Sequence, residues 1–224
     1  MLRWLPATDI LFGYSFLLTI IVCASLECAD QGDLSSMTPE LRTILLAKHN
    51  SLRSMLALGT AKVTSITELY SKQASEMPSL NYSCELEKSA YYRASQCANL
   101  MPSSLSGYEF TENMRKYFVP KTTLEKAAPG SVQLWWSEIT KLEIPIDRFG
   151  NIYRTNLAID SFAKIASDLT TAVGCSIVDC GDSEYNFVCH YNTTLKDGAK
   201  LYNIGTYCTG CKGGVKNCAN ALCI

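Results

Sequence analysis

The sequence contains only two histidines, and this scarcity limits the metal and acid–base chemistry that it can support. His49 and His190 are the only imidazoles among 224 residues. A histidine-rich zinc site would need both of them in one place, together with acidic residues. His49 falls on the apolar face of a predicted helix, and His190 falls in a predicted strand beside Cys189. We therefore interpret both as packed, hydrogen-bonded structural residues.

Several common signals of function are also absent. The sequence has no G-x-S-x-G, H-E-x-x-H or phosphate-binding glycine loop, and it has no internal repeat or low-complexity tract. The net charge is −1 and no run of basic residues occurs, which argues against nucleic acid as a partner. What remains is a chain that is 47% hydrophobic, long enough for one domain with its own core.

The first 24 residues differ from the rest and read as a signal peptide. Arg3 precedes an apolar run over residues 10–24, and Val22 and Ala24 fit the small-residue rule for cleavage. The run is shorter than the roughly 20 residues that span a bilayer, and no second apolar stretch follows. We expect a secreted, extracellular protein whose mature chain has no transmembrane segment.

The cysteine count agrees with export. The chain has eleven cysteines, and removal of Cys23 with the signal peptide leaves ten. An even number in an exported chain indicates disulfides rather than a reactive thiol, and we interpret C-T-G-C in the tail in the same way. Asn81-Tyr-Ser and Asn192-Thr-Thr are glycosylation candidates. The disulfide candidates are Cys28, Cys84, Cys97, Cys175, Cys180, Cys189, Cys208, Cys211, Cys218 and Cys223.

Apolar periodicity predicts several helices. The first spans about residues 38–59, with Thr38 as the cap, Pro39 at the first helical position and Gly59 at the exit. Its buried stripe consists of Leu41, Leu45, Leu52 and Leu56. We predict further helices within 63–76, from 83 to 97, after Ser131 and near 161–169, and an irregular segment over 98–121.

The last third of the chain predicts a hairpin and a disulfide-linked tail. T-A-V-G-C-S-I-V-D-C and Y-N-F-V-C-H-Y-N are rich in β-formers and are separated by G-D-S-E. The two strands put Cys175 opposite Cys189, so we expect that pair, and we expect Cys97–Cys180 as a second. The four cysteines after residue 196 should pair among themselves, because so short a segment cannot bury a useful core without cross-links.

One acid stands in an unusual setting, within L-W-W-S-E-I-T at residues 134–140. Trp135, Ile139 and Leu142 recur at helical spacing, and Glu138 lies at the edge of that apolar face. These residues alone leave open whether Glu138 lines a dry pocket or faces solvent. A pair such as Glu112 and Glu138 would suit glycoside hydrolysis only at a separation that the sequence does not show.

An ordered set of motifs resembles a known family. The motifs are H-N-S-L-R-S, C-E-L-E-K-S-A-Y-Y-R-A-S-Q-C, E-N-M, W-W-S-E-I, F-A-K-I-A-S-D-L-T-T-A-V-G-C, F-V-C-H-Y and the cysteine-rich tail, together covering about residues 28–224. The chain resembles the CAP superfamily, which includes cysteine-rich secretory proteins, insect venom antigen 5 and plant pathogenesis-related proteins. Within it the chain is most similar to the activation-associated secreted and venom-allergen-like proteins of nematodes.

The resemblance implies an α+β fold, a three-layer α-β-α sandwich with an antiparallel sheet and a small cysteine-rich C-terminal tail. We therefore divide the chain into a signal peptide (1–24), an N-terminal loop (25–37), a CAP or SCP domain (38–195) and the cysteine-rich tail (196–224).

The resemblance also implies a central cavity that, in many members, has two histidines and two glutamates able to hold a divalent metal. Glu112 of T-E-N-M and Glu138 of W-W-S-E-I match the two acids. The family histidines are replaced by Met101 and Ser161, while His49 matches a helix residue outside this set. We therefore expect a degenerate cavity, with no bound metal and no cofactor.

Four functions follow as hypotheses. We favour a secreted, non-enzymatic binding protein at a host–parasite interface, whose partners are host proteins or lipids and sterols. The alternatives are a peptidase-like hydrolase that uses the cavity acids, a lipid or sterol carrier, and a structural component of secretions. General-base catalysis needs a titratable group beside a nucleophile, and the matched cavity positions offer only the two glutamates.

Overall fold

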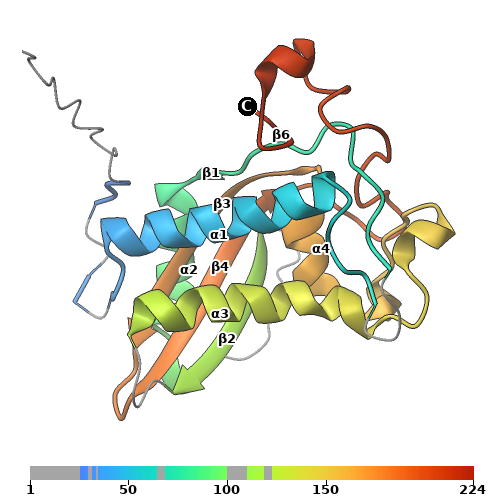
Figure 1. The fold of residues 1–224 in the computed structure, drawn as a ribbon. Coiled ribbons are helices and arrows are strands. Elements are labelled where there is room, and N and C mark those ends of the chain that lie inside the picture. The colour runs from blue at the N-terminus through green and yellow to red at the C-terminus, as the bar shows by residue number, and fades with distance from the viewer. Residues whose placement is uncertain (1–25, 30–31, 34, 65–68, 100–109, 119–122) are drawn as a thin grey trace, which may run out of the picture.

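A four-stranded sheet lies between two layers of helices (Figure 1). The computed structural model describes residues 26–29, 32–33, 35–64, 69–99, 110–118 and 123–224. The strands are β1 (Asn81–Tyr82), β2 (Thr111–Phe118), β3 (Thr170–Asp179) and β4 (Glu184–Thr193), in the spatial order β1-β3-β4-β2. The pairs β2–β4 and β3–β4 are antiparallel, as expected, whereas the two-residue edge strand β1 runs parallel to β3.

The helices divide between the two faces of the sheet, as the three-layer prediction required. Helices α1 (Pro39–Ala57), α3 (Leu124–Trp136) and α4 (Asp160–Ala166) contact one another on one face, and α2 (Cys84–Ala94) packs on β3 and β4 from the other (Figure 1). Short 3-10 helices occupy Cys97–Asn99, Ser137–Lys141, Ile146–Phe149, Thr155–Leu157 and Gly214–Asn217.

Helix α1 forms for the reasons that its sequence indicates. The Thr38 hydroxyl accepts a hydrogen bond from the backbone N–H of Leu41 at 3.1 Å, which satisfies one of the free donors at the helix start. Pro39 occupies the first helical position. The face toward the sheet buries His49 and the predicted leucine stripe, Leu41, Leu45, Leu52 and Leu56.

Helix α2 is capped in the same way, by Ser83, whose hydroxyl accepts from the N–H of Leu86 at 3.2 Å. Ala90 and Ala94 are buried against the sheet. Gly174 on β3 explains how close this helix lies, since a Cβ there would fall 2.2 Å from the backbone N of Glu87. The small residues on both sides therefore set the distance between α2 and the strands.

The predicted helix within 63–76 is wrong for the residues that the structure describes there. Residues 69–76 contain no helical turn and form isolated bridges, one of them between Ala74 and Ile204. The N–H of Ser71 donates to the Ala61 carbonyl at 2.8 Å, and the N–H of Ala74 donates to that of Ala57. Long-range backbone bonds to the end of α1 and to the tail outweigh the local helical pattern.

Two further boundaries differ from the prediction. Residues 111–118, expected to be irregular, form β2, because eight consecutive positions pair with β4. Helix α3 begins at Leu124 rather than after Ser131 and includes Pro129 within its second turn. A proline costs a helix one backbone hydrogen bond, and burial of Val132, Trp135 and Trp136 offsets that loss here.

All ten cysteines of the predicted mature chain are paired. The structure contains the two expected bonds, Cys175–Cys189 and Cys97–Cys180, and a third, Cys28–Cys84. The tail cysteines pair among themselves as Cys208–Cys218 and Cys211–Cys223, around a small ladder of β5 (Cys218–Ala219) and β6 (Leu222–Cys223). The two cysteines of the C-T-G-C motif thus bond to different partners and form neither a redox pair nor a thiolate site.

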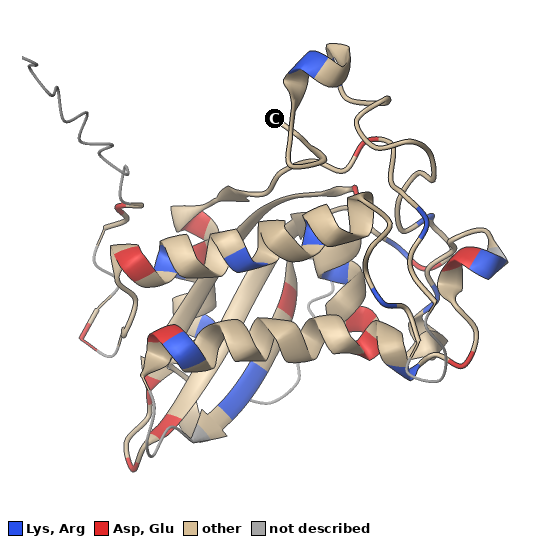
Figure 2. Cartoon of the chain, viewed as in Figure 1, with Lys and Arg blue, Asp and Glu red and all other residues tan. Residues whose placement is uncertain are grey.

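Charges of both signs are distributed over the described helices and strands without a continuous basic or acidic face in the view of Figure 2. This distribution agrees with the net charge of −1. Within the described ranges, no helix has the length and hydropathy needed to cross a bilayer.

Candidate functional site

Glu138 lies in the 3-10 turn Ser137–Lys141 that follows α3, and its carboxylate faces the start of α4. Its Oε2 accepts hydrogen bonds from the backbone N–H of Ser161 at 2.8 Å and of Phe162 at 3.0 Å. These are first-turn donors without partners inside the helix, so the carboxylate acts as a cap supplied from another element. Glu138 is half-buried and is neither a freely solvated charge nor an unengaged base.

Glu112 lies on β2 and points to the face of the sheet that α2 covers. Its Oε2 is 3.1 Å from Nε of Arg93, on α2, and 3.1 Å from Nε2 of His190, on β4. The Glu112 side chain is only 6% exposed, so its charge is balanced within the protein rather than by solvent. The two matched acids, Glu112 and Glu138, therefore have separate sets of hydrogen-bond donors.

Lys164 adds a positive charge to this region. Its Nζ donates to the backbone carbonyl of Glu112 at 2.8 Å, which joins α4 to β2. Burial lowers the pKa of Lys164, and the charges of Asp160, Glu138 and Glu112 act in the opposite direction. The ammonium thus lies within the electrostatic influence of Asp160 on its own helix and of the two matched acids, Glu138 and Glu112.

The two positions at which we expect the family histidines to be lost, Ser161 and Met101, differ in what the structure describes. Ser161 is the second residue of α4, and its N–H binds Glu138 while its carbonyl accepts from Nδ2 of Asn113 at 3.0 Å. Met101 lies outside the described residues. The structure therefore brings Glu138 and Ser161 into direct contact and links them to β2 through Asn113 and Lys164.

His49 has the structural role that the sequence indicated. It is fully buried, with Nδ1 2.8 Å from the Leu45 carbonyl and Nε2 3.0 Å from the Tyr191 hydroxyl. Burial lowers its pKa to about 4, so the ring is neutral at physiological pH.

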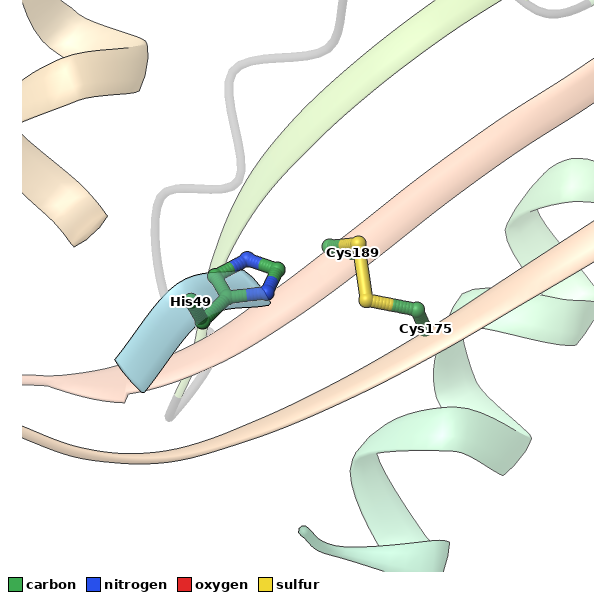
Figure 3. A group of neighbouring side chains, drawn as sticks. All are labelled: His49, Cys175 and Cys189. Carbon is green, nitrogen blue, oxygen red and sulfur yellow. A yellow bond between two sulfur atoms is a disulfide. The ribbon is translucent and has the colours of Figure 1, made fainter. Parts of the chain in front are cut away.

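His49 also lies beside the Cys175–Cys189 disulfide (Figure 3). The ring nitrogen and the two sulfurs are close enough to share an ion, but the sulfurs are bonded to each other. A metal would need thiolates and a free imidazole nitrogen. The group in Figure 3 is therefore a packed core contact.

Sequence reasoning missed Arg93, Lys164 and the pairing of His190 with Glu112. Arg93 and Lys164 look like ordinary charges on the solvent side of helices. The signal that could have found the third contact is the register of β2 against β4, and β2 itself was not predicted.

Comparison with known proteins identifies the family. Residues 46–191 match the cysteine-rich secretory protein family, CAP. The chain belongs to this family. Two similar proteins come from Ancylostoma caninum. "Ancylostoma secreted protein" is 28% identical over 184 residues, covering 80% of this chain, and "Hookworm platelet inhibitor 1" is 27% identical over 223 residues, covering 94%. The chain spans 43% of the first protein and 98% of the second.

A solved structure supports the same assignment. The crystal structure of "NaASP2 with Zn2+" superimposes with a TM-score of 0.74 at 26% identity, covering 88% of this chain and 100% of that one. The CAP fold is thus shared over most of the chain, including the helical layers around the sheet. The disulfides and the relative named as a secreted protein indicate an extracellular CAP protein, and proteins of this family are generally not enzymes.

Proposed function

We propose that the protein is secreted and acts by binding a partner at a host–parasite interface, not by catalysis at the cavity of Glu112 and Glu138. One observation carries the proposal: both acids are already engaged, Glu138 by the N–H groups of α4 and Glu112 by Arg93 and His190. A cavity hydrolase would need one of these carboxylates free to activate water or a nucleophile.

The residues also do not fit the metal that the family cavity holds in other members. Zinc prefers four nitrogen, sulfur or carboxylate ligands. Ser161 stands where the family has an imidazole, and Glu138 Oε2 already accepts two N–H groups. The Lys164 ammonium would repel a dication among the same acids. We therefore derive no metal-dependent step for this chain.

The partner class is proposed from the relatives. One relative that this chain matches nearly end to end is named a platelet inhibitor, and another is named a secreted protein. We propose a host protein as the partner. A carrier of lipids or sterols is the second candidate, and a hydrolase using the cavity acids is the third.

Identifying what the natively purified protein binds distinguishes these candidates. The mature protein would be used to capture partners from host plasma and cell membranes, and its bound lipids would be extracted and identified by mass spectrometry. A host protein that binds saturably supports the proposal, and a lipid bound in stoichiometric amount supports the carrier function. Peptidase turnover that disappears in Glu138→Gln, without any bound partner, contradicts the proposal.

A further inference from the structure

Three side chains on the α2 face of the sheet form a connected line. Ser89 Oγ, on α2, lies 2.7 Å from Nδ1 of His190, and Nε2 of the same ring lies 3.1 Å from Glu112 Oε2. His190 is 1% exposed and its ring stacks on Phe110 with 4.2 Å between ring centroids. The imidazole is thus held from both edges and over one face.

The contacts define a consistent protonation pattern. A neutral ring that donates its Nε2 proton to Glu112 leaves a lone pair on Nδ1, directed at the Ser89 hydroxyl. Serine, imidazole and carboxylate in this order are the parts of an activated nucleophile, recognised by geometry rather than by sequence motif. Arg93 Nε donates to the same Oε2 at 3.1 Å and helps to hold the carboxylate in place.

A purely structural network would be closed to ligands, whereas this one opens on a cleft. Ser89 is half-buried and lines an open cleft of about 690 Å³, of a size that takes small organic ligands. Apolar surface in the cleft comes from Leu86, Phe110 and Ala172, and one charge of each sign comes from Lys196 and Glu85. The Ser89 hydroxyl also lies 2.9 Å from the Leu86 carbonyl, so it has two acceptors between which its proton can turn.

We propose that Ser89 is a nucleophile that accepts acyl groups from small esters with apolar acyl chains. His190 serves as its general base, and Glu112 is a positioning residue. This activity goes beyond the proposed binding function and does not depend on it. It uses a nucleophile and an imidazole that lie outside the matched cavity positions, which is why the motifs indicated a non-enzymatic protein.

The reaction needs no reagent other than ester and water. Ser89 Oγ bonds to the ester carbonyl carbon while its proton passes to His190 Nδ1. The tetrahedral intermediate then expels the alcohol, which takes that proton. Water attacks the acyl-serine with His190 again as base, and the released carboxylic acid restores the serine.

The test uses the disulfide-bonded mature protein. It is first treated with peptide-N-glycosidase, because the sequon residue Asn192 also lines the cleft and a glycan there would obstruct the probe. A fluorophosphonate probe should label Ser89, as located by peptide mass spectrometry, and 4-nitrophenyl butyrate should be hydrolysed. Ser89→Ala should abolish the label. His190→Gln should slow labelling at least about 100-fold, because a positioned base contributes that much or more. Ser95→Ala, which removes a half-buried hydroxyl at the C-cap of the same helix, should label like the parent.

Thermal unfolding of each variant separates loss of chemistry from loss of fold. Glu112→Gln keeps the shape of the side chain and should slow labelling while the protein remains folded. Ser89→Cys should regain nucleophilic reactivity, measured with iodoacetamide, and should lose it when combined with His190→Gln. The proposal is overturned if the parent protein takes up no probe at Ser89, or if folded His190→Gln labels at the parent rate.

Discussion

His190 and Glu112 lie directly opposite each other on β4 and β2, and their side chains are joined at 3.1 Å between Nε2 and Oε2. Because side chains alternate along a strand, this register sends both toward α2 and sends Asn113 to the other face, where it bonds to Tyr191 at 3.3 Å. The acid that the family motif assigns to the cavity is thus held by His190 on the paired strand and by Arg93, and a metal would have to compete with these two donors for its charge.

The approach of α2 to the sheet depends on Gly174, which pairs with His190 in the β3–β4 register. We expect Gly174→Ala to destabilise the fold by about 2 kcal/mol or more, because its Cβ would lie 2.2 Å from Glu87 N and 2.4 Å from Ser83 O. Urea unfolding measures the change. Gly130→Ala is the matched control: its Cβ meets open space within α3, so the helix should gain up to about 1 kcal/mol. Equal effects of the two substitutions would contradict the close contact.

A buried ion pair links α1 to α2. Arg42 donates to both carboxylate oxygens of Glu87 at 2.7 Å, and Tyr82 donates to the same acid at 2.6 Å. Arg42→Met should cost about 3–5 kcal/mol, since it leaves a buried carboxylate without its cation. The half-exposed pair Lys116–Glu184, 3.7 Å apart, provides the control, and Lys116→Met should cost less than about 1 kcal/mol. Chemical denaturation at pH 7 compares the two, and similar costs would refute the assigned role of the buried pair.

The free energy of unfolding should fall in mild acid because the buried His49 resists protonation in the folded state. Burial lowers its folded pKa to about 4 from an ordinary value of 6.5, so the unfolded chain binds the proton more tightly. This contribution is present above pH 6.5 and is lost progressively as the pH falls toward 4, with an upper limit of about 3 kcal/mol. His49→Gln keeps a hydrogen-bonding group near Tyr191 and should reduce the loss between pH 7 and pH 4.5. An unchanged pH profile in urea denaturation would exclude His49 as the group responsible.

The oxidised state gives a mass prediction. The mature chain should begin just after Ala24 or Ser25 and carry five disulfides, as the structure pairs all ten of its cysteines. Alkylation of the unreduced, unfolded protein should add no label to its intact mass. Label on two or more cysteines would show that at least one bond is missing.

Local signals predicted much of the fold. The cap at Thr38, the leucine stripe of α1 and the hairpin of β3 and β4 are all encoded within short segments. Strand β2 was missed because Glu112, Arg115 and Lys116 interrupt its apolar pattern, and only pairing with β4 explains why they form a strand.

The candidate site was also predictable only in part, because local motifs are visible in the sequence and long-range pairing is not. Family motifs placed Glu138 and Ser161 in one region, and the structure joins them by a 2.8 Å hydrogen bond. The partners Arg93, His190 and Lys164 come from three other elements. Strand register and helix packing bring them together, and neither is visible in residue spacing along the chain.

The most direct test of the degenerate cavity is zinc calorimetry at neutral pH on three proteins: the mature chain, Met101→His with Ser161→His, and the same pair with Lys164→Gln. The natural chain should take up no zinc at this cavity. The paired histidines should create a site, and removal of the Lys164 ammonium should tighten it, because two imidazoles and two carboxylates suit zinc once the internal cation is gone. Tight, stoichiometric zinc binding by the natural chain that disappears in Glu138→Gln would contradict the account.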